Sequence, residues 1–80
     1  MTTEEKKKVL KAEVSQKYER IKYKFAVSFH KGEISKDDLR MRNKFIDREK
    51  AIKLAEIDHM SYYKINNRYE SLMQKSNPDE

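Results

Sequence analysis

The chain of 80 residues contains no cysteine and no tryptophan, and it has one glycine and one proline. Without cysteine, the protein can form neither a disulfide nor a thiolate metal site. Folds rich in β-strands need turn residues at every corner, and one glycine and one proline are too few to supply them. The sequence therefore predicts an all-α fold.

Apolar residues are also scarce, because 36% of the residues are hydrophobic and 41% are charged. No segment approaches the roughly 18 apolar residues of a membrane-spanning helix, and no apolar stretch follows the N-terminal lysines as it would in a secretory signal. We therefore expect a cytoplasmic protein that does not contact a membrane. A core this small rarely supplies more than about 3–5 kcal/mol of net stability, so we expect very regular helix packing, self-association or a partner to add to it.

Local signals mark where helices begin and end. Thr2-Thr3-Glu4-Glu5 matches a capping box, in which a hydroxyl and a glutamate each accept a backbone N–H. Gly32 suits the position that follows a helix C-terminus. Ser35, which is followed by two aspartates at 37 and 38, marks the start of a second helix. We predict one domain, residues 1–75, with helices over about residues 3–31, 36–57 and 61–75, the last two separate or continuous, and a frayed tail at 76–80.

The first two segments predict an antiparallel hairpin. Apolar residues recur at helical intervals from Leu10 to Phe25, and a connection of a few residues makes neighbouring helices antiparallel. In that register, facing positions have numbers that sum to about 67. This places Leu10 near Ile57, and it places Phe25 near Met41 and Phe45.

Residues after about Lys64 have no counterpart on the first helix in this register, although several of them are apolar. The chain then either breaks at residues 58–61 and folds back as a third helix, or continues as one long second helix that overhangs and packs against another chain, as in a dimer. The residues that we expect to bind a partner are Tyr62, Ile65, Tyr69, Leu72 and Met73.

These unpartnered residues lead to the main functional hypothesis. We expect a small non-enzymatic regulatory or adaptor protein whose C-terminal helix binds a protein partner or a second copy of the chain. The sequence has no Gly-rich phosphate loop, and we expect no catalytic residue, cofactor, metal or small-molecule substrate. Glu56 and His59 have the E-x-x-H spacing of di-iron bundles, but the glutamates of the first helix lie beside its apolar stripe. We therefore interpret this pair as an exposed glutamate and a boundary histidine.

The alternative is a DNA-binding helix-turn-helix transcriptional regulator with residues 61–75 as its recognition helix. Asparagine and arginine side chains bind base edges, whereas lysine and serine suit phosphates. The residues that would contact nucleic acid are Lys64, Asn67, Arg68 and Ser71. In a general way, the stretch from Leu54 to Leu72 resembles the last two helices of sigma-factor-like or phage-type regulators.

Two features oppose this alternative. The tight turn of a helix-turn-helix normally carries glycine, and here that position falls on Asp58 or His59. Residues 50–80 are also neutral overall, with five basic and five acidic side chains.

A second alternative is non-specific nucleic-acid binding through the basic first helix. The chain has a net charge of +5, and residues 1–34 hold nine lysines and arginines against five glutamates. Such binding would depend on Lys17, Arg20 and Lys24 and would weaken steeply as the salt concentration rises.

Overall fold

The structure, a computed structural model, describes residues 1–75, which form three helices. These are α1 (Thr3–His30), α2 (Lys36–Asp58) and α3 (Tyr62–Lys75). No strand occurs among the described residues, so the prediction of an all-helical fold is confirmed. The tail expected at 76–80 lies outside the described residues.

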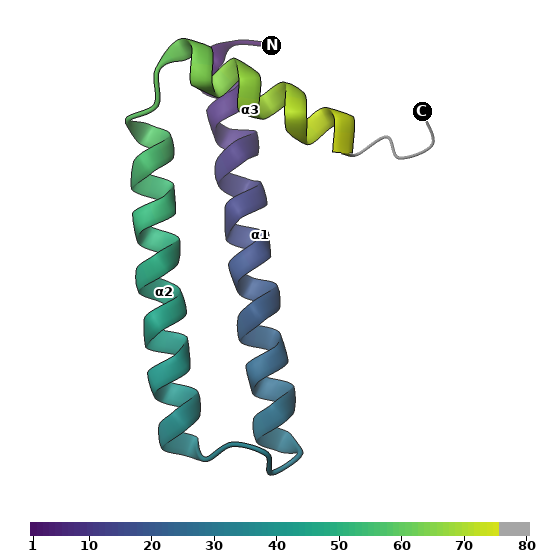
Figure 1. The fold of residues 1–80 in the computed structure, drawn as a ribbon, viewed down its shortest axis with the longest axis vertical. Helices are drawn as coiled ribbons and strands as arrows, with labels where there is room; N and C mark the ends of the chain where they lie inside the picture. Colours follow the sequence, from purple (N-terminus) through teal and green to yellow (C-terminus); the bar gives the residue numbers. More distant parts are fainter. Residues whose placement is uncertain (76–80) are drawn as a thin grey trace.

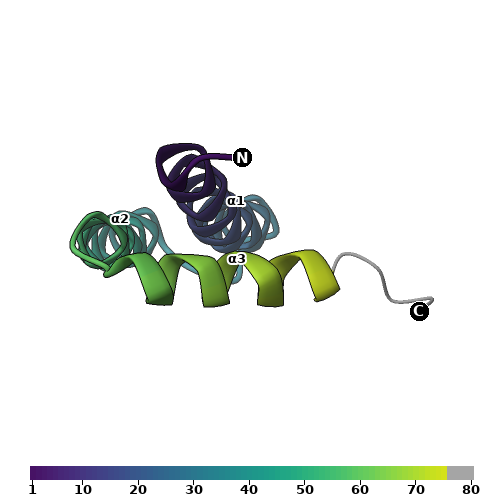
Figure 2. The same cartoon turned by 90° about the horizontal axis from the view of Figure 1, so that it is seen from above.

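The helices form a flat arrangement. Helices α1 and α2 lie side by side in opposite directions, and α3 crosses the end at which α1 begins and α2 ends (Figure 1). From above, α3 starts at α2 and passes across α1 (Figure 2). The Cα atoms span 45 × 32 × 14 Å.

The helix ends form where the local signals lie. The Thr2 hydroxyl accepts the Glu5 N–H at 3.2 Å, and the Glu5 carboxylate accepts the Thr2 N–H at 3.2 Å. The carboxylate of Glu5 accepts hydrogen bonds from the Thr2 N–H and, at 3.0 Å, from the Thr2 hydroxyl, and these two bonds lower the pKa of Glu5. Gly32 has a φ of 77°, which a residue with a Cβ rarely adopts. The Ser35 hydroxyl accepts the N–H of Asp38 at 3.1 Å and caps α2.

Three residues separate α2 from α3. The backbone of His59 is no longer helical, with φ −100° and ψ 6°, although its N–H still donates to the Ala55 carbonyl at 3.2 Å. Ser61 caps the start of α3, because its carbonyl accepts the Ile65 N–H at 3.0 Å and its hydroxyl accepts the Lys64 N–H at 3.4 Å. The chain thus breaks after α2, and α3 is a separate helix.

The core lies where the three helices meet. Leu10 of α1, Ile57 of α2 and Ile65 of α3 are 5%, 2% and 1% exposed and pack against one another. Around them lie the partly buried side chains of Val14, Met60 and Leu72. Each helix supplies one buried side chain to this core, so the position of α3 depends on very few apolar contacts.

Ion pairs join α1 and α2 along their length. The pairs are Lys22 with Asp47 at 2.9 Å, Lys50 with Glu19 at 3.1 Å, and Lys11 with Asp58. The residue numbers of each pair sum to 69, two more than the predicted register. The hydrogen bond to Asp47 raises the pKa of Lys22.

The burial of Ile65 gives a stability prediction. Replacing Ile65 with alanine should lower the free energy of unfolding by about 2–5 kcal/mol, because the substitution opens a cavity beside Leu10 and Ile57. Among residues 1–75, Ile65 is the only buried side chain of α3. Tyr23→Ala is the control, since Tyr23 is 71% exposed and its replacement should cost no more than about 0.5 kcal/mol. Urea unfolding followed by far-UV circular dichroism measures both, and equal losses would contradict the position of Ile65.

Candidate functional site

The residues predicted to bind a partner lie mostly on the inner side of α3. Ile65 belongs to the core and Leu72 packs against it. Tyr69 and Met73 are half-buried, and Tyr62 is 61% exposed. The expectation that α1 offers these residues no cover therefore requires correction. The antiparallel register applies to α2, whereas α3 crosses α1 and meets it over only a short length.

Lys6 of α1 holds the middle of α3. Its ammonium group donates a hydrogen bond to the Asn66 side-chain oxygen at 2.6 Å and lies 5.4 Å from the centroid of the Tyr69 ring. A cation over an aromatic face is attracted by the ring quadrupole. Lys6 is thus a structural contact of α3, and no local pattern predicts this contact because Lys6 and Asn66 are 60 residues apart.

Two lysines of α1 also fix the end of α2. Lys11 forms an ion pair with the Asp58 carboxylate, and the Lys7 ammonium donates to the Asp58 carbonyl at 3.2 Å. The hydrogen bond from Lys11 lowers the pKa of Asp58, and the charges of Lys11, Lys7 and His59 add to the effect. Cations here also complement the negative end of the α2 dipole. The point where the chain turns into α3 is therefore held to α1.

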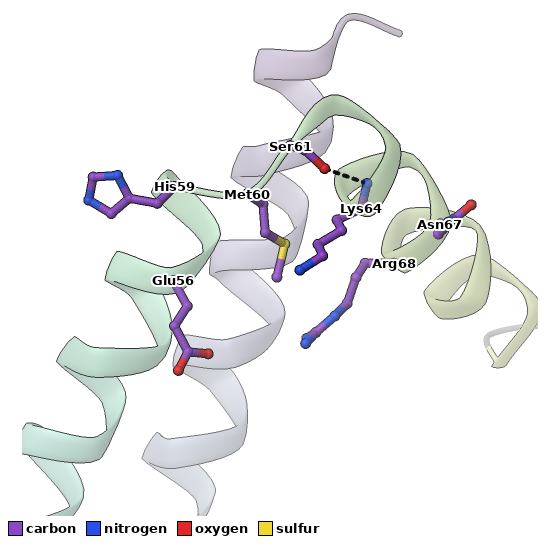
Figure 3. A pocket seen from close by; sticks show the side chains of 7 residues that line it. All are labelled: Glu56, His59, Met60, Ser61, Lys64, Asn67 and Arg68. Carbon is purple, nitrogen blue, oxygen red and sulfur yellow. Dashed lines mark hydrogen bonds between the residues drawn. The ribbon is translucent and has the colours of Figure 1, made fainter.

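The residues predicted to contact nucleic acid, Lys64, Asn67, Arg68 and Ser71, are all exposed on α3. The first three line an open groove between the end of α2 and α3, together with Glu56, His59, Met60 and Ser61. In Figure 3, Lys64 and Arg68 extend toward the side of the groove that Glu56 occupies, whereas Asn67 and His59 point away from it. Ser71 lines a second, smaller groove between α1 and α3, where Arg68 also contributes. The four side chains thus share a helix face without converging on one point.

The turn differs from that of a helix-turn-helix in two ways. Among residues 1–75, no residue other than glycine has a positive φ, so the turn lacks the left-handed residue that this motif usually carries. Helix α3 also packs chiefly against α1 rather than against α2.

Several cations of α1 are already engaged within the molecule. Lys6, Lys7, Lys11 and Lys22 make the contacts described above. Lys17, Arg20 and Lys24 remain exposed. The charge that α1 offers to a phosphate backbone is therefore smaller than its composition indicates, and binding through α1 stays a prediction.

Helix α2 carries an exposed apolar stripe that the sequence analysis did not identify. Met41, Phe45 and Ile52 are 70%, 60% and 46% exposed, and their intervals of four and seven place them on one side of the helix. We call these three residues the α2 edge. Ile46 and Ile57 are buried on a different side of α2, so the helix has two apolar stripes.

Phe25 lies near Met41 and Phe45, as the register predicts, but Met41 and Phe45 stay exposed. All three line a hollow of about 330 Å³, together with Asp38, Arg42 and Ile46. The guanidinium of Arg42 lies 5.3 Å from the centroid of the Phe25 ring. Arg42 therefore covers Phe25, and the side chains of Met41 and Phe45 project into solvent. The sequence signal of a second stripe is that Met41, Phe45 and Ile52 lie on a different side of the helix from Ile46 and Ile57 when their spacings are compared.

No metal site is evident in the described part of the chain. No group of three or more histidine, aspartate or glutamate side chains within residues 1–75 is placed to hold an ion. The side chains of Glu56 and His59 point apart (Figure 3).

Comparisons with known proteins give no family. The chain matches no family model, no curated protein and no solved structure. Within residues 1–75, no helix combines the length and the apolar composition that crossing a membrane requires.

The contacts of Asp58 predict a dependence of stability on pH. The pKa of Asp58 is lower in the folded protein than its usual 3.8, so its contribution is complete above that value and is lost as the pH falls through the lowered pKa. Asp58→Asn should flatten the acid side of the curve of unfolding free energy against pH.

Urea unfolding between neutral pH and about pH 2 measures this curve. Glu70→Gln is the control, because Glu70 forms no ion pair among the described residues. The same acid slope in Asp58→Asn and in the unaltered protein would contradict the contact with Lys11.

Proposed function

We propose that the protein is a small non-enzymatic adaptor or regulatory protein that acts by binding a protein partner, which includes a second copy of itself. The binding surface that we assign is the α2 edge with the adjoining hollow. Exposed apolar patches on a folded chain mark interaction sites, and methionine and aromatic side chains are enriched in interfaces.

The observation that carries this proposal is a contrast between buried and exposed side chains. Only four hydrophobic side chains are buried in the described part of the chain, while Met41 and Phe45 are both at least 60% exposed. Burial of such a side chain contributes about 1.5–3 kcal/mol. In the isolated chain, Met41 and Phe45 stay exposed and contribute little of this free energy. Burial of the two side chains against a partner would therefore contribute most of it to binding.

The C-terminal helix has a smaller part in this proposal than the sequence suggested. Its apolar side packs on α1, and Tyr62 and Tyr63 at its start are 61% and 79% exposed. These two rings offer a second contact area near the end of α2.

A photo-crosslinking amino acid at position 45, introduced in the cells that produce the protein, tests the proposal. We expect one discrete covalent adduct, which an excess of the unaltered protein suppresses. The same probe at Tyr23, which is 71% exposed on α1, is the matched control and should give no such adduct. Identical patterns at the two positions, or no adduct at either, would refute a protein-binding role of the α2 edge.

Nucleic-acid binding through the outer face of α3 is a second candidate. The observation that favours it is the exposure of Lys64 and Arg68, neither of which forms an ion pair among the described residues. Their charges remain free to contact phosphates, and Asn67 lies on the same face of the helix. The turn geometry and the packing of α3 on α1 do not favour it.

Gel retardation of duplex DNA at low salt tests this candidate. If α3 reads DNA, replacing Asn67 and Arg68 with alanine should abolish sequence-specific retardation at unchanged helix content, with a loss of about 1–3 kcal/mol for each base contact. Replacing Lys17 and Lys24 instead should affect retardation only if α1 binds phosphates non-specifically. Absence of any retardation in the unaltered protein would remove both nucleic-acid hypotheses.

A further inference from the structure

The chain exposes more surface than a compact monomer of its mass usually does. A folded monomer of 9.7 kDa exposes about 5,100 Å², whereas this chain exposes 6443 Å². The excess exceeds the roughly 800 Å² that each partner buries in an interface of standard size. The Cα atoms extend only 14 Å along the shortest axis of the molecule. Because such a thin molecule covers little of its own surface, its shape accounts for an excess of this size.

We propose that the α2 edge binds the α2 edge of a second copy, with the two α2 helices antiparallel about a two-fold axis. This inference rests on the proposed function and specifies its partner. Helix α2 has 23 residues and is therefore about 35 Å long. That length is enough for a helix-to-helix seam, and the seam would extend the flat pair α1 and α2 into a layer of four helices.

The spacing along the edge is that of a helix-to-helix seam. The three residues of the α2 edge and two further residues, Arg48 and Ala55, follow one another at intervals of four, three, four and three along α2, in the order Met41, Phe45, Arg48, Ile52 and Ala55. This is the spacing at which two helices interlock their side chains. The edge thus has the periodicity of a helical partner rather than that of an irregular loop.

Arg48 disfavours a parallel second helix in register. In a parallel pair in register, Arg48 would face its own counterpart, and such a contact between like charges opposes association. In an antiparallel pair, Met41 faces Ile52 of the second copy and Arg48 faces Phe45 of the second copy, where a cation lies favourably over an aromatic ring.

The charges beside the edge complement one another in the same register. Arg42 and Glu49 flank the edge on one side, seven residues apart. The two-fold axis brings Arg42 of each copy beside Glu49 of the other, so the attraction occurs twice. Arg42 can make this contact while its guanidinium remains over Phe25, because the group is exposed.

Sedimentation equilibrium of the full chain tests the proposal. We expect a mass twice the chain's 9.7 kDa. Phe45→Glu should raise the dissociation constant at least roughly 30-fold, as loss of an interface anchor does. Tyr23→Glu, at an aromatic residue that lies outside the edge and is 71% exposed, should leave the constant unchanged. Circular dichroism checks that each variant keeps its helices.

Charge exchange tests the register. Arg42→Glu and Glu49→Arg should each weaken the dimer about three- to ten-fold, and the double variant Arg42→Glu/Glu49→Arg should restore it. If the double variant is no tighter than either single variant, the register is refuted.

Cysteine cross-linking tests the direction, since the chain has no cysteine of its own. Met41→Cys alone should form no disulfide between copies, because antiparallel helices separate the two positions by about 16 Å. The double variant Met41→Cys/Ile52→Cys should readily form a disulfide between copies, because position 41 faces position 52 of the second copy. A disulfide in the single variant indicates parallel helices and overturns the antiparallel arrangement.

A monomeric mass at every concentration, with helix content intact, overturns the self-association itself. In that case, a discrete adduct of another mass from the photo-crosslinker at position 45 would still support the proposed function. The absence of that adduct as well would refute both, so the two failures are distinguishable.

Discussion

The meeting of Leu10, Ile57 and Ile65 determines how the rest of this molecule is arranged. Each of the three helices contributes one of these side chains, and together they form the buried junction at the end where α3 crosses the pair. Ile65 reaches the junction because the chain leaves helical geometry at His59 and resumes it after Ser61. The contacts of Lys6 with α3 and of Lys11 with Asp58 then hold both sides of the turn against α1.

This junction decides which surfaces remain for binding. Because α3 turns its apolar side toward α1, the helix presents mainly polar side chains outward, with Tyr62 and Tyr63 exposed at its start. The exposed apolar stripe then belongs to α2, where Met41 and Phe45 project on a side different from that of the buried Ile46. Several lysines of α1 are engaged within the molecule at the same time, which reduces the free positive charge of that helix. A protein-binding role is therefore better supported than a role based on net charge.

The sequence predicted those features that depend on neighbouring residues. The single glycine and proline predicted helices without strands, and the cap at Thr2 and the cap at Ser35 follow from hydroxyls placed beside free N–H groups. The crossing of α3 was not predictable from the register, because that register relates only the antiparallel pair α1 and α2. Lys6 and Lys11 find their partners 60 and 47 residues away, and no local pattern indicates such contacts. The α2 edge was overlooked because Met41 and Phe45 were expected to face Phe25 of the first helix.

The central claim is that α3 is a separate helix, docked on α1 through Ile65. Amide hydrogen exchange of Tyr62 and Tyr63 tests it most directly. In a separate helix these first-turn N–H groups have no intrahelical acceptor, so both amides should exchange rapidly while the amide of Ile65 and those that follow it are protected. If α2 and α3 were one continuous helix, Tyr62 and Tyr63 would be protected to the same degree as their neighbours on both sides. That result would contradict the separate helix and the surfaces assigned from it.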